Sequence, residues 1–154
     1  MIVYRLSKKR YRGDLSGKGA ELAGGRWNSV GNAVLYTAEN RALCAAEIAV
    51  HTPLGIVPQD YFLVTLEIPK RASIRTIKPV ELPEKWRVFP YLPATLLIGD
   101  QFLNEGSHLV LKVPSAVIPG EFNYLINPRH PDFRNVKLLQ SEPFEFDQRM
   151  FGRK

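Results

Sequence analysis

The sequence predicts an α+β fold, a single compact domain of short twisted sheets with a few helices. Segments with strand composition outnumber the two helical segments and do not alternate regularly with them, which excludes a doubly wound parallel sheet. The 154 residues are 45% hydrophobic and 23% charged, which is typical of one globular domain with its own core. The 12 prolines are spread out, and no internal repeat divides the chain. We therefore expect residues 1–154 to form one domain.

The N-terminal part is expected to contain a strand, a long loop and a hairpin. Residues 2–6 have strand composition. Residues 8–25 are polar, basic and glycine-bearing, which predicts a long loop, and long loops in compact domains are more often functional than accidental. Residues 26–29 and 33–36 predict two strands joined by a turn at residues 30–32.

Two helices are predicted. Thr37 is the expected N-cap of a helix over residues 38–51, with Glu39 in its first turn. An apolar stripe of Leu43, Ala46 and Val50 has helical spacing. The second helix is expected over residues 94–104, with Gly106 as its stop.

The remaining elements are expected to be strands. Residues 61–68 are almost continuously hydrophobic, which favours a position inside the sheet. Residues 69–92 are rich in proline and are expected to be irregular, with a short strand around residues 74–77. Further strands are predicted over residues 108–113, 122–126 and 144–146.

The net charge of +6 is concentrated near the N-terminus. Residues 1–38 carry seven basic side chains against two acidic ones. Such a balance is compatible with nucleic acid, an anionic small molecule or an acidic protein as partner. The basic loop around Lys8 to Lys18 is interpreted as an anion funnel, as a docking surface for a protein partner or, for each lysine taken singly, as a solvated face.

Several common functional classes are excluded or disfavoured. A single cysteine, Cys44, excludes an internal disulfide. No metal site is expected, because the three histidines (His51, His108 and His130) lie far apart. No phosphate-binding glycine loop or nucleophile elbow is present. No apolar run approaches the roughly 20 residues of a membrane span, and the N-terminus lacks a signal pattern, so we expect a cytoplasmic protein.

Two charged residues have sequence neighbours that are unusual for a charged side chain. Arg26 lies in Gly24-Gly25-Arg26-Trp27-Asn28, where glycines allow a ligand to approach the backbone and a guanidinium suits phosphate oxygens. A surface arginine at a strand end explains the same pattern equally well. Glu47 interrupts an otherwise apolar stretch, residues 43–50. It is either a partner in a structural salt bridge or a catalytic carboxylate with an adjusted pKa, and we favour the second.

Three other residues carry weaker signals. Ser115 follows the predicted strand over residues 108–113, and serines there are most often turn or capping residues. Tyr36 closes the strand 33–36 and is more often a core residue than a site residue. Cys44 lies three residues before Glu47, but its apolar neighbours favour an inert core thiol.

Taken in order, these motifs resemble the RES-domain family, which is named for an arginine, a glutamate and a serine. Those residues fall on Arg26, Glu47 and Ser115. The supporting motifs are Tyr4-Arg5-Leu6, Val34-Leu35-Tyr36-Thr37-Ala38, Ile98-Gly99-Asp100, Val113-Pro114-Ser115-Ala116-Val117 and Asn123-Tyr124-Leu125-Ile126-Asn127-Pro128. The resemblance covers nearly the whole chain. One departure is Gln101-Phe102 after Gly99-Asp100, where a tryptophan is expected, and we interpret it as a packing difference.

The resemblance implies a toxin of a bacterial toxin–antitoxin pair that arrests growth, with a fold like that of ADP-ribosyltransferases. Family members consume NAD+ as glycohydrolases or phosphorylases, and some relatives ADP-ribosylate a protein instead. The implied partner is an Xre-type helix-turn-helix antitoxin that covers the active site, with a toxin homodimer inside a larger complex. NAD+ is then a substrate, inorganic phosphate an alternative acceptor to water, and no cofactor is permanently bound.

The resemblance also implies roles for single residues. Glu47 would stabilise the oxocarbenium-like transition state, and Arg26 would hold the pyrophosphate. Tyr36 would stack on the nicotinamide, and Ser115 would hydrogen-bond the ribose or carboxamide. Asn28, in the same motif as Arg26, joins this expected NAD+-binding set.

Two other functions are alternatives to that of an NAD+-degrading toxin. A mono-ADP-ribosyltransferase would share the NAD+ half of the site, so only the need for a protein acceptor separates the two. A nucleic-acid-binding domain predicts aromatic residues among the basic ones or a basic recognition helix. Only Tyr4 and Tyr11 lie near the basic cluster and neither predicted helix is basic, which disfavours this class.

Overall fold

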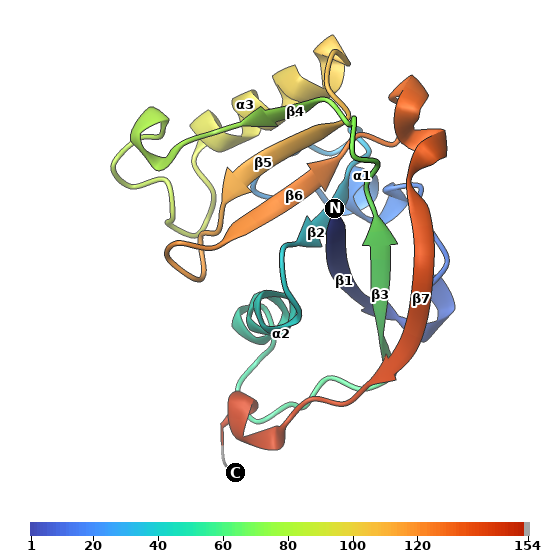
Figure 1. Cartoon of the computed structure of the whole chain (residues 1–154). Helices are drawn as coiled ribbons and strands as arrows, with labels where there is room; N and C mark the ends of the chain where they lie inside the picture. The colour runs from blue at the N-terminus through green and yellow to red at the C-terminus, as the bar shows by residue number, and fades with distance from the viewer. Residues whose placement is uncertain (153–154) are drawn as a thin grey trace.

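The computed structural model describes residues 1–152, which form a mixed sheet with helices packed around it (Figure 1). The strands are β1 (Ile2–Lys8), β2 (Leu35–Ala38), β3 (Tyr61–Glu67), β4 (Ile74–Thr76), β5 (Val110–Pro114), β6 (Phe122–Ile126) and β7 (Lys137–Phe144). The α-helices are α1 (Lys18–Ala23), α2 (Arg41–Val50) and α3 (Pro93–Glu105). The predicted α+β class is confirmed, and β1, β3, β5, β6 and α3 lie within a few residues of their predicted positions.

The seven strands form one sheet in the order β4-β5-β6-β2-β1-β3-β7. Only β4 and β5 run parallel, and all other neighbours are antiparallel. β1 pairs with β3 along its whole length, whereas its register with β2 is the single pair Tyr4–Ala38. The sheet therefore opens into two arms, β4-β5-β6-β2 and β1-β3-β7, which diverge visibly in Figure 1. β3 lies inside the sheet, as its continuous hydrophobicity predicts.

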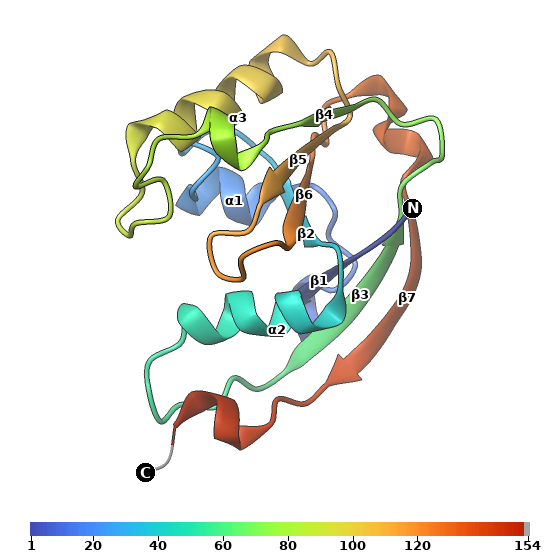
Figure 2. The ribbon, with the colours of Figure 1, turned by 60° about the vertical axis from the view of Figure 1, so that its left-hand side comes forward.

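Two main apolar clusters form the core, and the first of them joins the two arms. One joins β1, β3, β5 and β6 through residues such as Val3, Val64 and Val110, all of which are inaccessible to solvent. The other packs Phe102 of α3 and two loop residues, Trp27 and Trp86, against Leu111 and Leu125 of the sheet. α2 packs against β1 and β2, at the point where the arms separate (Figure 2). Within residues 1–152, none of the helices has the length and apolar character that a membrane span requires.

The predicted loop over residues 8–25 contains α1, and the predicted strand over residues 26–29 does not form. α1 is six residues long and buries none of them fully, so its sequence carries no apolar stripe that could indicate a helix. Gly17 and Gly24, with φ of 72° and 70°, bound this helix. After it, Gly25 and Asn28 form an isolated bridge around a tight turn, which replaces the predicted strand.

The start of α2 and the position of β7 also differ from the prediction. Thr37 is buried within β2, and its hydroxyl donates to the carbonyl of Tyr124 at 2.7 Å, so it cannot cap the helix. Asn40 caps it instead, with Oδ1 accepting from the amide of Leu43 at 2.8 Å. The strand predicted over residues 144–146 is wrong beyond Phe144, which is the last residue of β7. The earlier residues of β7 were not predicted because they are mostly exposed and show no alternation.

Candidate active site

A cavity of about 650 Å³ lies where α2, β1 and β2 meet three loop segments, around residues 25–27, 87–91 and 116–117. It brings together Arg26, Tyr36 and Glu47, three of the residues singled out in the sequence. The other two, Asn28 and Ser115, lie directly behind these side chains. The cavity walls also include titratable and aromatic residues that were not predicted to belong to the site: Arg5, His51, Arg87, Phe89 and Tyr91.

Glu47 lies on α2 with its half-buried carboxylate at the cavity wall. Burial raises the pKa of this carboxyl. The hydrogen bonds from Ser115 and Asn123 lower it, and so do the nearby charges of His51 and Arg26. None of the described residues forms an ion pair with Glu47 within 4.0 Å, so the structural salt bridge considered as its alternative is not found within residues 1–152. The carboxylate is therefore held by hydrogen bonds and remains available to a ligand.

Ser115 supports Glu47 from the end of β5. Its side chain is 1% exposed, and its Oγ accepts hydrogen bonds from the amides of Val117 and Ile118 at 3.1 and 3.0 Å. The hydroxyl proton is thereby directed to Oε1 of Glu47, at 3.3 Å. Ser115 thus combines the role of a turn residue with that of a hydrogen-bond donor to Glu47, and its own surface does not line the cavity.

Arg26 is bonded to the loop that forms the opposite wall. Its guanidinium donates to the carbonyls of Trp86 at 2.6 Å, Val88 at 3.1 Å and Arg87 at 3.3 Å. Its Cζ lies 5.0 Å from the ring centroid of Tyr91. Burial lowers the pKa of this arginine, while Tyr91 and Glu47 act in the opposite direction. The simple surface arginine considered in the sequence is thereby excluded.

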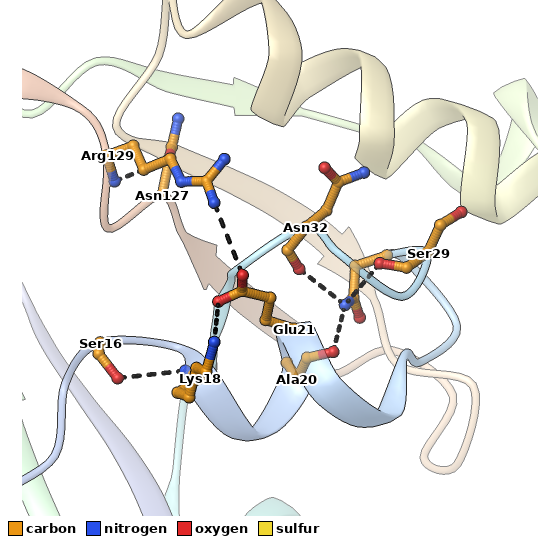
Figure 3. A network of polar contacts seen from close by, with 9 residues as sticks. Ser16, Lys18, Ala20, Glu21, Ser29, Asn32, Asn127 and Arg129 are labelled. Atoms are coloured by element: carbon orange, nitrogen blue, oxygen red, sulfur yellow. Dashed lines mark hydrogen bonds and ion pairs between the residues drawn. The ribbon is translucent and has the colours of Figure 1, made fainter.

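Tyr36 is fixed by its hydroxyl, which donates to Oδ1 of Asn28 at 2.7 Å and accepts from the amide of Trp27 at 3.2 Å. Burial raises the pKa of this phenol, so it remains protonated. Asn28 is inaccessible to solvent, and its Nδ2 donates to the carbonyls of Ala20 and Asn32 at 2.8 and 3.0 Å. Figure 3 shows these carbonyl groups converging between α1 and the following turn. Asn28 therefore positions Tyr36 and does not line the cavity.

The turn that carries Arg26 is anchored to α3. Asp100 Oδ1 accepts from the amide of Ser29 at 2.9 Å and from Nδ2 of Asn32 at 2.8 Å, and its Oδ2 accepts from the Ser29 hydroxyl. Next to it, a Cβ on Gly99 would lie 1.6 Å from the carbonyl oxygen of Trp27. The motif Ile98-Gly99-Asp100 thus holds the turn close to the helix.

The charge of the cavity comes from arginines other than those of the basic loop. Arg5, Arg26 and Arg87 line it, whereas Lys8, Lys9, Arg10, Arg12 and Lys18 do not. The interpretation of the basic loop as an anion funnel is therefore not supported by its position. Cys44 also lines the cavity, and burial raises the pKa of its thiol to about 12, in keeping with an inert thiol. No group of three or more potential metal ligands occurs within residues 1–152.

Comparison with known proteins identifies the family. The RES domain model matches residues 2–147. The "Prs ADP-ribosylating toxin" of Sphingobium sp. is 40% identical over 139 residues, covering 89% of this chain and 86% of the relative. A "Toxin Res" of Pseudomonas putida is 38% identical, covering 98% and 100%. In the crystal structure of the M. tuberculosis MbcT–MbcA toxin–antitoxin complex, one chain is similar in fold, with a TM-score of 0.74, 20% identity and coverage of 97% and 86%. The chain therefore belongs to the RES domain family.

Proposed function

We propose that this chain is the toxin of a bacterial toxin–antitoxin pair and that it degrades NAD+ by cleaving the bond between nicotinamide and ribose. The observation that carries this proposal is the half-buried carboxylate of Glu47, held by Ser115 in a cavity whose other charged walls are arginines. One anionic group among several cationic groups matches a substrate that carries a pyrophosphate and forms a cation at its reacting carbon.

Each wall of the cavity has a role in this reaction. Glu47 stabilises the positive charge that develops on the ribose as nicotinamide departs. Nicotinamide is already a cationic leaving group, so no strong general acid is needed. Arg5, Arg26 and Arg87 provide the positive charge that attracts the pyrophosphate. Tyr36, whose hydroxyl is engaged behind the cavity, offers its ring to the nicotinamide.

Asn28 and Ser115 act one step further from the substrate. Both are buried and bonded to the residues that line the cavity, so we assign them positioning roles toward Tyr36 and Glu47. This assignment replaces the direct contacts with ribose or carboxamide that the family resemblance implies for Ser115. The acceptor of the ADP-ribosyl group is water or inorganic phosphate in this proposal, and NAD+ is a substrate rather than a resident cofactor.

A second candidate function is transfer of ADP-ribose to a protein. The relative that is 40% identical is named an ADP-ribosylating toxin, and the NAD+ half of such a site would be the same. For either reaction we propose a cytoplasmic toxin that forms a homodimer within a larger complex with an Xre-type helix-turn-helix antitoxin. The structural neighbour from M. tuberculosis, a toxin–antitoxin complex, supports an antitoxin as partner.

Nicotinamide release from NAD+ by the purified, partner-free chain tests the proposal. The assay is run with and without inorganic phosphate, and Glu47→Gln provides the control for contaminating activity. Release without a protein acceptor supports NAD+ degradation, and dependence on phosphate selects phosphorolysis over hydrolysis. A folded sample that releases no nicotinamide contradicts NAD+ degradation and favours protein ADP-ribosylation.

A further inference from the structure

Phe89 is an aromatic side chain left open at the mouth of the cavity. Its side chain lines the cavity, yet the residue is 71% exposed, whereas Phe102, Phe146 and Phe151 are almost completely buried. Ligand pockets are typically lined by hydrophobic and aromatic side chains. Phe89 therefore combines an exposed aromatic ring with a position on the cavity wall.

The ring of Phe89 is held in place by its surroundings. Its centroid lies 5.3 Å from that of Tyr91 and 6.3 Å from that of His51, both in edge-on geometry. Its loop is fixed by the hydrogen bonds that Arg26 donates to the carbonyls of residues 86–88. A flat apolar surface with fixed orientation loses little entropy when a planar ligand stacks on it.

The cavity changes character from its interior to its mouth. Glu47, Tyr36 and Arg26 are half-buried, whereas Arg87, Phe89 and His51 are exposed. The loop over residues 87–91 contributes Arg87, Phe89 and Tyr91 to this wall, so that two aromatic side chains lie beside an arginine. Aromatic rings beside cations suit a nucleotide, because the rings stack on a base and the cations attract its phosphate.

We propose that Phe89 is the stacking platform for the second base of a dinucleotide substrate, the purine farthest from the scissile bond. This inference rests on the proposed function, which places the nicotinamide end beside Glu47 and Tyr36. The pyrophosphate then lies near Arg26 and Arg87, and the adenosine half extends to the mouth. Phe89 thereby distinguishes a dinucleotide from a mononucleotide that carries the same scissile bond.

The test compares Phe89→Ala with Phe89→Trp and with Val80→Ala. The tryptophan retains a stacking surface, and Val80, which is 87% exposed and does not line the cavity, controls for loss of an exposed apolar group. Loss of one base–aromatic stack predicts that Phe89→Ala raises KM for NAD+ about tenfold, with kcat within about twofold. Phe89→Trp and Val80→Ala should leave KM near that of the unchanged protein. ADP-ribose, titrated by calorimetry, should bind Phe89→Ala about tenfold more weakly.

Nicotinamide mononucleotide supplies the matched ligand, because it lacks the second base. As a competitor of NAD+ turnover it should inhibit the unchanged protein and Phe89→Ala equally. The proposal is overturned if Phe89→Ala weakens the binding of NAD+ and of nicotinamide mononucleotide equally. It is also overturned if Phe89→Ala leaves both KM for NAD+ and the affinity for ADP-ribose unchanged, and the ring would then be a protein contact instead. If the unchanged protein does not cleave NAD+, the proposed function fails, and the ADP-ribose titration alone decides the role of Phe89. In that case, absence of ADP-ribose binding to the unchanged protein overturns the proposed stacking role of Phe89.

Discussion

Ser115 donates the proton of its hydroxyl to Glu47 because its Oγ already accepts two backbone amides, those of Val117 and Ile118. The turn that follows β5 therefore determines the direction of a hydrogen bond into the cavity. That bond lowers the pKa of Glu47, whereas burial of the carboxyl raises it. Ser115 thus acts on the protonation of Glu47 without contacting the cavity.

Ser115→Ala should move the acid limb of the activity profile to higher pH. Without the donor, burial of Glu47 is less opposed, so its pKa rises further and the carboxylate is lost at a higher pH. The variant should also lose about 1–3 kcal/mol of stability, because the two amides lose their acceptor. kcat/KM for NAD+ measured against pH, with chemical denaturation, checks both effects. Ser141→Ala is the matched control, since the Ser141 hydroxyl is buried without a partner within residues 1–152. An unshifted acid limb would contradict this role of Ser115.

Glu47→Gln should abolish NAD+ cleavage and stabilise the protein at neutral pH. We expect a loss of at least about a hundredfold in kcat, the cost of removing one electrostatic stabiliser of a transition state. Because the folded-state pKa of Glu47 is raised, its protonated form is favoured by folding. In the unchanged protein, the stability that protonated Glu47 contributes is complete below the ordinary pKa of glutamate. It is lost as the pH rises through the raised folded-state pKa, and glutamine does not suffer this loss.

The stability difference between Glu47→Gln and the unchanged protein should therefore depend on pH. It should favour the variant at neutral pH and vanish in acid, where Glu47 is protonated in both the folded and unfolded states. Denaturant unfolding at several pH values measures it. A variant that is equally stable at every pH would show that burial does not oppose ionisation of Glu47.

The sequence revealed site residues whose chemistry conflicts with their neighbours. Glu47 could be predicted as a site residue because burying a carboxylate in an apolar helical stretch costs free energy unless the carboxylate is paired. Arg26 could be predicted because glycines precede it. The partners of Arg26 could not be found, because the carbonyls it binds are 60 to 62 residues away in the chain. Phe89 and Arg87 were missed for a related reason. They lie in an irregular segment with no periodicity, whose position depends on those distant bonds.

The same distinction applies to the fold. Buried strands such as β3 carry a hydrophobic signal that indicates their place in the sheet. β7 is held mainly by its backbone pairing with β3, and α1 by polar contacts around Glu21, which pairs with Lys18 at 3.5 Å and Arg129 at 3.9 Å (Figure 3). Neither element contains a fully buried residue, so no apolar pattern in the sequence indicates it.

Arg26→Lys should impair NAD+ binding although it preserves the charge. A lysine ammonium cannot reach three carbonyls with the fixed geometry of a guanidinium, so the loop over residues 86–91 loses part of its support. We expect affinity to fall by about 1.5–3 kcal/mol for Arg26→Ala and by a smaller amount for Arg26→Lys. Amide hydrogen exchange of residues 86–91 should be faster in both variants. Weaker NAD+ binding with unchanged amide exchange of residues 86–91 would mean that Arg26 contacts the ligand and does not support the loop. Arg87→Ala leaves the three hydrogen bonds from Arg26 in place and is the control for the loss of one positive charge.

Gly99→Ala should destabilise the protein and remove activity together, because it acts on the turn that carries Arg26. The added Cβ would lie 1.6 Å from the carbonyl oxygen of Trp27, a backbone atom that cannot move without displacing the turn. Alanine favours a helix over glycine by about 1 kcal/mol, whereas overpacking against backbone costs about 3 kcal/mol, so the net effect is destabilising.

Gly19→Ala in α1 is the matched control. Its Cβ would meet nothing within 4 Å, so the helix preference acts alone and should raise stability by about 0.5–1 kcal/mol. Thermal unfolding of the two variants should thus shift in opposite directions, and NAD+ cleavage should fall only in Gly99→Ala. A Gly99→Ala protein with unchanged stability would contradict the close packing of α3 on the turn.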